Sequence, residues 1–546
     1  MKKNTLILIF IMAAVTFLGG FLRFYKITQN PPSLTGDEIS FAYSAYSILK
    51  TGKDEHGKFL PLTLEAVGDY KNPLPAYLMI PSIKMFGLTD FAVRFPNALL
   101  GTVSIPIFFM FLLDIFKKKK IALLGSFFLL ISAWHIFYSR FAYEGITAGL
   151  FILLGIWFFT KMLNGKIIWA ILSSFFLTLT MYTAPAPRLF VPIFVALAII
   201  VSLPKFKKNL KTSGVFIITC IVLGLPMVYS TLFQGSGTRF NMVFISHDIE
   251  FSRYVLLKYF SSVSDLPLLF FFWIKRYLSY FNPSFIFFNG LEATAPGPIG
   301  LGILYVFEIP LLIAGITSFI KNKIQFKELF FIWIFAGILP DSITNNQKHT
   351  GRLLYLFPVL IILTALGAIE LYNLLIKVKK IYLKLTIASL FGIIVLLVLT
   401  HAFLIISADF PRDKGESFDE GLREAVYYVQ VNRDKYKEIV FDPARGVAAP
   451  NIITNSFLYV LFYTKYDPLT YQTEQKITSM PGYESYYKFG KYTFRHIDWQ
   501  KDQYEKDVLF IGSPWSLPEK DFKNGELLKK IYLTNGSAAF FIVSPK

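Results

Sequence analysis

Cysteine and histidine are scarce in this sequence, with one and six residues among 546. The single cysteine, Cys220, excludes an intrachain disulfide, and its position in an apolar run is typical of a small buried hydrophobic residue. The sequence has no His or Cys spacing of a zinc site, and no Walker loop, Rossmann fingerprint or haem motif. Enzyme classes that depend on those motifs are therefore excluded.

Acidic residues are also few, since 36 Asp and Glu stand against 55 Lys and Arg and the formal net charge is +19. Apolar residues, in contrast, make up 54% of the chain. A soluble protein does not combine so many apolar runs of about 20 residues. The lysines stand at the ends of these runs, where they set topology and attract anionic lipid. We therefore expect the basic residues to contact the lipid bilayer, and we expect no nucleic-acid partner.

Eleven apolar runs predict a polytopic α-helical membrane protein. One set of ends of these runs, the N-terminus included, holds 19 lysines, whereas the short loops of the alternate set hold Arg140, Arg188, Lys348 and Arg352. Because Lys and Arg are retained in the cytoplasm during insertion, we expect the N-terminus inside and the sparsely charged loops outside the cytoplasmic (plasma) membrane. The expected helices cover residues 5–25, 91–116, 121–138, 145–162, 167–183, 189–203, 213–232, 299–320, 328–340, 353–376 and 385–407.

The chain is expected to divide into a transmembrane domain, residues 1–407, and an extracytoplasmic α/β domain, residues 408–546. Two long outer loops interrupt the first domain, at 27–90 and 233–298, and the earlier loop contains two amphipathic stretches suited to the membrane interface. In the second domain, helical periodicity and short apolar runs predict one helix and three strands at 418–431, 438–442, 507–511 and 538–543.

Two acidic residues, Asp37 and Glu38, lie near the start of the first outer loop. A carboxylate close to the membrane face can accept a proton from an attacking hydroxyl, so Asp37 is a candidate general base. The alternative is a helix cap, because Asp37 precedes an amphipathic stretch and helix N-termini favour negative charge. The two roles are compatible.

Basic residues occupy the same predicted side of the membrane. Lys71 precedes the second amphipathic stretch, where a lysine either neutralises a lipid phosphate or extends from the interface to water. Arg140 and Glu144 stand four residues apart between the third and fourth helices. They form a local salt bridge or, as ionisable groups near the bilayer, belong to a functional site. Arg188, after the fifth helix, is an interfacial anchor or a further candidate.

Arg352 opens the tenth expected helix, three residues before Tyr355. Helix N-termini favour anions, and a guanidinium offers phosphate two parallel hydrogen bonds. Anchoring at the membrane interface is the alternative interpretation. His349 is a poor candidate for a metal ligand, because no His or Cys partner stands at a suitable spacing. Together, the acidic and basic candidates fit a site that handles a lipid phosphate and activates a hydroxyl.

The order of these motifs resembles that of bacterial GT-C glycosyltransferases of the protein-mannosyltransferase and aminoarabinose-transferase kind, which are family 39 and its relatives. The similar layout extends over residues 5–410 and is most specific in the first third. The sequence departs from the family at Asn72, at Glu144 and in the gap between Arg352 and Tyr355. The matching segments are the acidic pair Asp37-Glu38, the Lys-Pro-Pro-like Lys71-Asn72-Pro73, Arg140 with Glu144, and Arg352 with Tyr355 before Pro358.

The resemblance implies an inverting enzyme that moves a sugar from a polyprenyl-phosphate donor to an acceptor hydroxyl of a lipid, protein or envelope glycan. It implies that Asp37 is the catalytic base and that the substrate-binding residues are Glu38, Lys71, Arg140, Glu144, Arg352 and Tyr355. Of these, the three cations would hold the departing phosphate. Some GT-C relatives use a divalent cation between carboxylates. Here the basic residues can neutralise the phosphate, so we expect no metal and no cofactor.

Two other functions remain open at this stage. A lipid-linked sugar transporter or flippase commonly shows repeated halves and charges near the membrane midplane, whereas this chain shows neither. An oligosaccharide ligase or polymerase would use the same donor at the same face. Such proteins usually place their basic residues in a late loop, and the early Asp37-Glu38 pair argues against this function.

Overall fold

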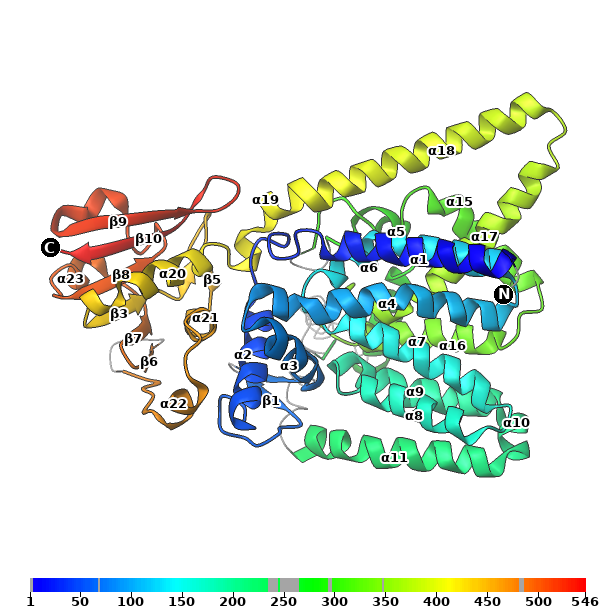
Figure 1. Cartoon of the computed structure of the whole chain (residues 1–546), viewed down its shortest axis with the longest axis horizontal. Helices are drawn as coiled ribbons and strands as arrows, with labels where there is room; N and C mark the ends of the chain where they lie inside the picture. The colour runs from blue at the N-terminus through cyan, green and yellow to red at the C-terminus, as the bar shows by residue number, and fades with distance from the viewer. Residues whose placement is uncertain are drawn as a thin grey trace. The chain divides into compact units, whose positions relative to one another are not determined.

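The computed structural model describes residues 3–66, 69–233, 244–245, 265–292, 297–345, 348–480 and 486–546. Their contacts divide the chain into two compact units (Figure 1). The first unit contains Met1–Tyr25, Asp69–Leu74 and Asn97–Ile405. The second contains Lys26–Gly68, Pro75–Pro96 and Ile406–Lys546. The loop at 27–90, which was predicted to lie outside, therefore groups with the C-terminal region except for Asp69–Leu74.

The first unit is a bundle of apolar helices. Among the described residues, six helical segments are long and apolar enough to cross a membrane, and a pair of shorter helices bent by 57° makes a seventh. The chain is thus a multi-pass membrane protein, as the hydrophobic runs predict. The six are α1 (Lys3–Phe24), α4 (Asp90–Phe116), α7 (Gly145–Met162), α11 (Leu210–Phe233), α17 (Phe357–Ile376) with the short turn η3 (Leu354–Leu356), and α18 (Ile381–Leu404); the bent pair is α5 (Lys119–Ile131) and α6 (Ala133–Ser139).

Shorter helices account for the remaining predicted runs: α8 (Ile167–Thr180), α9 (Pro185–Val201), α15 (Glu308–Lys321) and α16 (Lys327–Ser342). A further short helix, α10 (Leu203–Lys208), was not predicted and lies in a lysine-rich loop. Two sequence-based expectations were wrong in detail. The single helix expected at 121–138 is broken at Ser132, whose hydroxyl accepts a hydrogen bond from the His135 amide and so caps α6. The helix expected from 299 begins at Glu308, because the preceding chain packs tightly: a Cβ on Gly302 would lie 2.3 Å from the Ile286 carbonyl oxygen.

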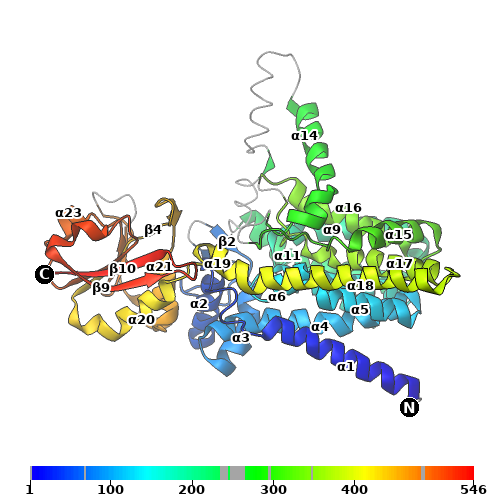
Figure 2. The same ribbon diagram turned by 90° about the horizontal axis from the view of Figure 1, so that it is seen from above.

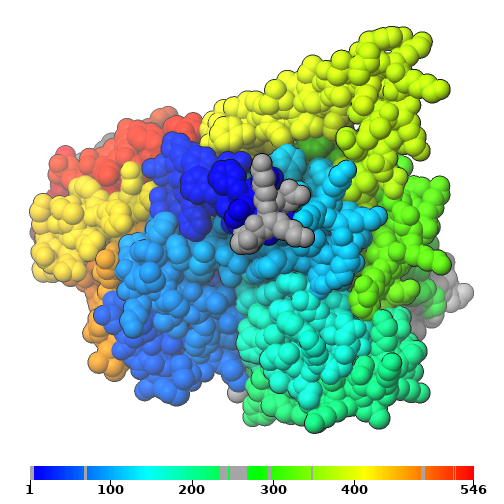
Figure 3. All heavy atoms as spheres, turned by 45° about the vertical axis from the view of Figure 1, so that its right-hand side comes forward, coloured from blue at the N-terminus to red at the C-terminus, as the bar shows by residue number. Residues whose placement is uncertain are grey.

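Close backbone contact joins the helices of this unit. At the crossing of α15 and α17, a Cβ on Gly315 would lie 1.8 Å from the Leu363 carbonyl oxygen, and one on Gly367 would lie 1.7 Å from that of Leu311. Small residues permit such contact between membrane helices. In contrast, α18 is described throughout and buries only Ala402, and the space-filling view shows its exposed length (Figure 3). Its apolar surface is suited to lipid.

The predicted second outer loop, 233–298, lies partly outside the described residues. Its described part contains α14 (Asp265–Ser279), which the sequence analysis did not predict, and a π-helical turn η2 (Phe285–Asn289). Helix α14 runs across the direction of the neighbouring helices (Figure 2), and its Trp273 indole donates to the Ser342 hydroxyl at the end of α16 (3.0 Å).

The second unit begins with the first outer loop. Both amphipathic stretches are helices, α2 (Gly36–Thr51) and α3 (Leu74–Phe86), and a short strand β1 (Leu64–Ala66) lies between them; β2 (Asp69–Lys71) belongs to the first unit. Helix α2 packs on α21 (Ser456–Tyr463) of the C-terminal region. The Tyr459 hydroxyl donates to the Leu34 carbonyl (2.9 Å), and the Gln472 amide donates to the Asp54 carbonyl (2.8 Å). These contacts explain why this loop and the C-terminal region form one unit.

The C-terminal region is built on a mixed six-stranded sheet. Its strand order is β6-β7-β3-β8-β10-β9, in which β3 runs parallel to β7 and β8. Strands β3 (Glu438–Phe441), β8 (Val508–Gly512) and β10 (Ala538–Pro545) confirm the three predicted strands, and α20 (Leu422–Asn432) confirms the predicted helix. The sheet is completed by β6 (Tyr486–Phe489), β7 (Tyr492–Arg495) and β9 (Gly525–Tyr532), and the other elements are α19 (Phe410–Lys414), β4 (Ala444–Arg445), β5 (Ile452–Ile453), α22 (Pro468–Thr473) and α23 (Trp499–Asp502).

Candidate active site

The candidate base, Asp37, lies in the first turn of α2 with an exposed side chain. The cap of this helix is Thr35: its hydroxyl accepts a hydrogen bond from the Glu38 amide (3.2 Å), and the Glu38 carboxylate accepts one from the Thr35 amide (2.9 Å). This reciprocal pair is a capping box. The prediction that Asp37 is the cap was therefore wrong, but its negative charge does lie in the first turn of α2, where a helix N-terminus favours it.

Glu38, in contrast, is fully buried and forms an ion pair with Arg94 in the first turns of α4. The Arg94 Nε–Glu38 Oε1 distance is 3.0 Å, and both side chains are sealed from solvent. The same guanidinium donates to three backbone carbonyls of the chain that leads into α2, those of Ile27, Pro31 and Ser33. Arg94 thus holds the segment that positions Asp37. The sequence analysis missed it, although an arginine near the start of an apolar helix is an unusual residue.

In the first unit, Asn72 ties the Lys71 segment to the turn between α8 and α9. Its amide nitrogen donates to the Met181 carbonyl (2.9 Å), and its amide oxygen accepts from Arg188 Nη2 (2.8 Å). A proline at position 72 could make neither hydrogen bond. The departure from the Lys-Pro-Pro pattern therefore has a structural counterpart, and it brings the predicted candidate Arg188 close to half-buried Lys71.

Arg140 is buried and donates to the carbonyls of Leu22 (2.8 Å) and Tyr25 (2.7 Å). These oxygens lie at and just beyond the C-terminal end of α1, where a positive charge is favourable. Glu144, directly before α7, is half-buried and makes no side-chain cap for that helix. The bonds that Arg140 makes in the structure thus fix the end of the first helix, and its predicted role at phosphate stays a prediction.

A buried carboxylate, Asp341 at the end of α16, is the centre of a further group of polar residues. It accepts hydrogen bonds from Arg352 Nη1 (3.2 Å), from the Tyr280 hydroxyl (2.7 Å) and from the His349 amide (2.9 Å). Arg352 also donates to the Thr344 hydroxyl (3.2 Å). The sequence analysis did not identify Asp341, because its position inside a short apolar helix gives no local signal of its partners.

Two more basic residues bind residues that themselves contact Asp341 or Arg352, Lys348 through its backbone amide. Buried Arg276 of α14 donates to the carbonyl of Thr344, the residue whose hydroxyl binds Arg352. The amide of Lys348 donates to the Tyr280 hydroxyl (3.1 Å), and burial lowers the pKa of the Lys348 ammonium. We call Arg276, Lys348 and Arg352, together with Asp341, the cationic cluster. Of its three basic side chains, Arg352 pairs with Asp341, Arg276 binds the Thr344 carbonyl, and the Lys348 ammonium lies over the Phe285 ring, 5.7 Å from its centroid.

Tyr143 connects this cluster to the loop that holds Glu144. Its ring stacks on His349, with ring centroids 5.7 Å apart. Burial, and then the charge of Glu144, raises the pKa of the Tyr143 hydroxyl, while the charge of Arg352 opposes that shift. The structure therefore brings Glu144 and Arg352, which are far apart in sequence, into one electrostatic environment.

Tyr355 lies in the interior of the first unit, 1% exposed. Its hydroxyl donates to the Gly337 carbonyl (2.9 Å) and its ring packs on Phe190 at 5.0 Å. These contacts hold η3 against α16 and α9, so the structure gives this predicted substrate-binding residue a packing role. Of the predicted site residues, Lys71, Arg140, Glu144, Arg352 and Tyr355 lie in the first unit, and Asp37 and Glu38 lie in the second.

Among the described residues, no three His, Cys, Asp or Glu side chains form a group that could hold a metal ion. Metal independence remains a prediction.

Comparison with known proteins agrees with this architecture. Residues 13–236 match the family model described as dolichyl-phosphate-mannose-protein mannosyltransferase. Among solved structures, the chain is similar to ArnT from Cupriavidus metallidurans in the apo state, with a TM-score of 0.55, 12% identity, and coverage of 99% of this chain and 98% of that chain. The same ArnT bound to undecaprenyl phosphate gives a TM-score of 0.54 at the same identity and coverage. No curated protein sequence matches.

These comparisons confirm the GT-C fold and the resemblance to the protein-mannosyltransferase and aminoarabinose-transferase group that the motif order indicates. The names of these relatives associate them with dolichyl-phosphate mannose and with undecaprenyl phosphate.

Proposed function

We propose that this GT-C membrane protein is an inverting glycosyltransferase that moves one sugar from a polyprenyl-phosphate donor to an acceptor hydroxyl. The single observation that carries the proposal is the cationic cluster. Arg352 pairs with Asp341 at the end of α16, Arg276 binds the Thr344 carbonyl next to it, and the Lys348 ammonium lies over the Phe285 ring. A lipid phosphate supplies the negative charge that such a group favours.

The proposed reaction forms one bond and breaks one. The acceptor oxygen attacks the anomeric carbon from the side opposite the phosphate, the bond between that carbon and the phosphate oxygen breaks, and the configuration inverts. The acceptor proton passes to the Asp37 carboxylate. The leaving polyprenyl phosphate departs already ionised, so it needs positive charge more than a general acid. In this account Lys71 and Arg352, with Arg276 and Lys348, stabilise the charge that develops on it.

The other predicted residues take supporting roles in this proposal. Arg94 and Glu38 fix the start of α2, and with it Asp37. Asn72 and Arg188 fix the Lys71 segment, and Arg140 fixes the end of α1. Glu144 orients a sugar hydroxyl or the neighbouring cations. Because positive side chains supply the charge that a divalent cation would otherwise bring, we propose that transfer is independent of metal.

The site is proposed to lie at the outer face of the cytoplasmic membrane, with the N-terminus inside and the C-terminal region outside. Support comes from the lysine asymmetry, since residues 117–120, 205–211 and 377–384 are rich in lysine at the opposite helix ends. Protease protection of a tag at each terminus in oriented vesicles would check this orientation.

The direct experiment incubates purified protein with a panel of polyprenyl-phosphate sugars and separate lipid, peptide and glycan acceptors, with and without EDTA. Mass spectrometry of the product should show the addition of a single sugar, unchanged by the chelator. Addition of a whole chain would instead identify a ligase or polymerase. Passage of the donor across vesicle membranes without any transfer would identify a transporter and contradict the proposal.

A further inference from the structure

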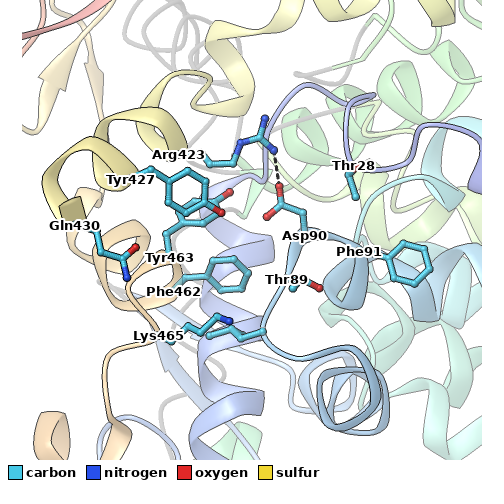
Figure 4. A pocket seen from close by; sticks show the side chains of 11 residues that line it. Thr28, Thr89, Asp90, Phe91, Arg423, Tyr427, Gln430, Phe462, Tyr463 and Lys465 are labelled. Atoms are coloured by element: carbon cyan, nitrogen blue, oxygen red, sulfur yellow. Dashed lines mark hydrogen bonds and ion pairs between the residues drawn. The ribbon is translucent and has the colours of Figure 1, made fainter. Parts of the chain in front are cut away.

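A pocket of about 560 Å³ lies within the second unit, lined by the start of α4 and by α20 and α21 of the C-terminal region (Figure 4). Its lining combines tyrosine rings with Asp90, Arg423, Gln430 and Lys465. None of these residues belongs to the proposed transfer site. The lining thus offers aromatic faces together with hydrogen-bonding groups of several kinds.

The most informative residue of the pocket is Tyr463. Its side chain is 5% exposed, and its buried hydroxyl has no hydrogen-bond partner among the residues that the structure describes. A buried hydroxyl without a partner is costly, and such groups are uncommon in folded proteins. Neighbouring Tyr427 meets the Tyr463 ring at 5.5 Å in an edge-on arrangement and is itself 49% exposed. The pocket therefore has an unsatisfied donor and acceptor beside an exposed aromatic ring.

The charges of the pocket indicate the kind of ligand. Asp90 and Arg423 form an ion pair at 2.8 Å, so the guanidinium charge is already balanced by a carboxylate. The Asp90 carboxylate and the Arg423 guanidinium are planar, and each can form hydrogen bonds with two further polar atoms. The side-chain amide of Gln430 can do the same. An anion would meet the carboxylate of Asp90, whereas a neutral ligand with many hydroxyls finds both donors and acceptors. These features favour an uncharged polyol over a phosphate.

Lys465 lies at the edge of the pocket, just after α21. Its φ of 52° belongs to the end of that helix, where the Lys465 amide donates to the Phe462 carbonyl (3.1 Å) and the Tyr466 amide donates to the Leu461 carbonyl (2.9 Å). In Figure 4 the Lys465 side chain lies on the opposite side of the pocket from Arg423.

We propose that this pocket binds a sugar ring of a neutral glycan. The apolar face of the ring would stack on Tyr427, and its hydroxyls would bind Tyr463, Gln430 and the Asp90–Arg423 pair. This saccharide site is separate from the residues proposed for transfer, and its binding function does not depend on the proposed reaction. In a membrane enzyme such a site would hold a glycan at the protein surface.

The test uses the full-length protein in lipid nanodiscs, because detergents with sugar head groups would compete. Saturation-transfer-difference NMR with methyl α-D-mannopyranoside, methyl β-D-galactopyranoside and maltotriose as probes should show binding of at least one probe. Tyr463→Phe removes only the hydroxyl and is expected to weaken that binding about fivefold, the worth of one hydrogen bond. Tyr427→Ala removes the stacking surface and is expected to weaken it at least tenfold.

The matched control is Tyr504→Phe, at a tyrosine that is 70% exposed and does not line the pocket; it should leave binding unchanged. Absence of binding by all three glycans, or binding that both pocket variants leave unchanged, would overturn the proposal. Displacement of the bound glycan by inorganic phosphate at equal concentration would show an anion site instead, and would also overturn it.

Discussion

Arg94 and Glu38 form an ion pair across 56 residues of sequence, with Nε and Oε1 3.0 Å apart and both side chains buried. The pair does more than neutralise two charges. Because the other nitrogens of Arg94 bind the carbonyls of the incoming chain, the whole approach to α2 is organised around this guanidinium. Asp37 is the next residue before Glu38, so the position of the proposed base depends on a residue of another helix.

Replacement of Arg94 by alanine should therefore destabilise the protein strongly. It leaves Glu38 buried without a counter-charge, and breaking a buried pair in this way costs about 3–5 kcal/mol. The loss of stability is measured as the change in the free energy of unfolding of the solubilised protein, with unfolding followed by fluorescence. Lys58→Ala breaks the exposed Lys58–Glu65 pair and is the matched control, with an expected cost of about 0–1 kcal/mol. Equal effects of the two substitutions would contradict the organising role of Arg94.

Asn72→Ala should lower donor affinity without unfolding the protein. The substitution removes the acceptor of Arg188 and the donor to Met181, so the Lys71 segment loses two of the hydrogen bonds that attach it while the helices keep their packing. We expect an increase in the KM for the lipid donor of about tenfold, which corresponds to roughly 1.4 kcal/mol. Asn72→Asp keeps an acceptor for Arg188 and should recover part of the affinity. An unchanged KM in Asn72→Ala would show that the attachment is irrelevant to the donor.

Lys348 makes the cationic cluster sensitive to alkaline pH. Burial lowers the pKa of its ammonium, so the charge is present below that pKa and is lost at a lower pH than for an exposed lysine. Donor affinity should accordingly fall as the pH rises through the alkaline range. Lys348→Arg keeps its charge throughout this range and should shift the fall to higher pH. A binding profile that is identical in the two proteins would exclude Lys348 from donor binding.

The proposed convergence of Asp37 and Lys71 can be tested by cross-linking. The base and the phosphate-binding ammonium must flank the same anomeric carbon, so cysteines at the two positions should be joined by a short bifunctional thiol reagent. The chain has one cysteine, and Cys220→Ser provides a clean background. Asp37→Cys combined with Lys379→Cys is the control, because the charge pattern predicts the opposite membrane side for residue 379. Cross-linking of the control pair alone would contradict the proposed geometry.

The helices of the first unit could be predicted largely from the sequence, because the length of an apolar run is itself the physical requirement for crossing a bilayer. Helix α14 was not predicted, because it does not form a continuous apolar run. It carries Asp265, Lys275 and Arg276 among its apolar residues, and its partners, such as Ser342 on α16, are distant in sequence. The break at Ser132 was missed because a single hydroxyl caps the following helix without interrupting the hydrophobic pattern.

In the C-terminal region, the three predicted strands are those with continuous apolar runs. Strand β9 was not predicted, because the edge strand of the sheet contains Glu526, Lys529 and Lys530 and so lacks a strand pattern. Charge on an edge strand discourages pairing with other molecules. The charged residues that kept β9 from being predicted thus have a physical role at the edge of the sheet.

In the candidate site, the sequence identified individual charged residues but not the partners that lie far from them along the chain. The sequence identified charged residues in the outer loops, and the structure assigns Arg352 and Glu144 to one electrostatic environment through Tyr143. It could not identify Arg94, Asp341 or Arg276 as partners, because each acts through contacts with residues far along the chain. For Tyr355 the sequence motif indicated binding, whereas burial against Phe190 and Gly337 indicates packing.

The central claim is that the Asp37 carboxylate removes the proton from the acceptor hydroxyl. Its most direct test is the rate of sugar transfer by Asp37→Asn, measured together with thermal unfolding and donor binding. The account predicts loss of transfer by at least a hundredfold, the low end of the contribution of a general base, with folding and donor binding intact. A folded Asp37→Asn protein that transfers sugar at the rate of the unmodified chain would contradict it.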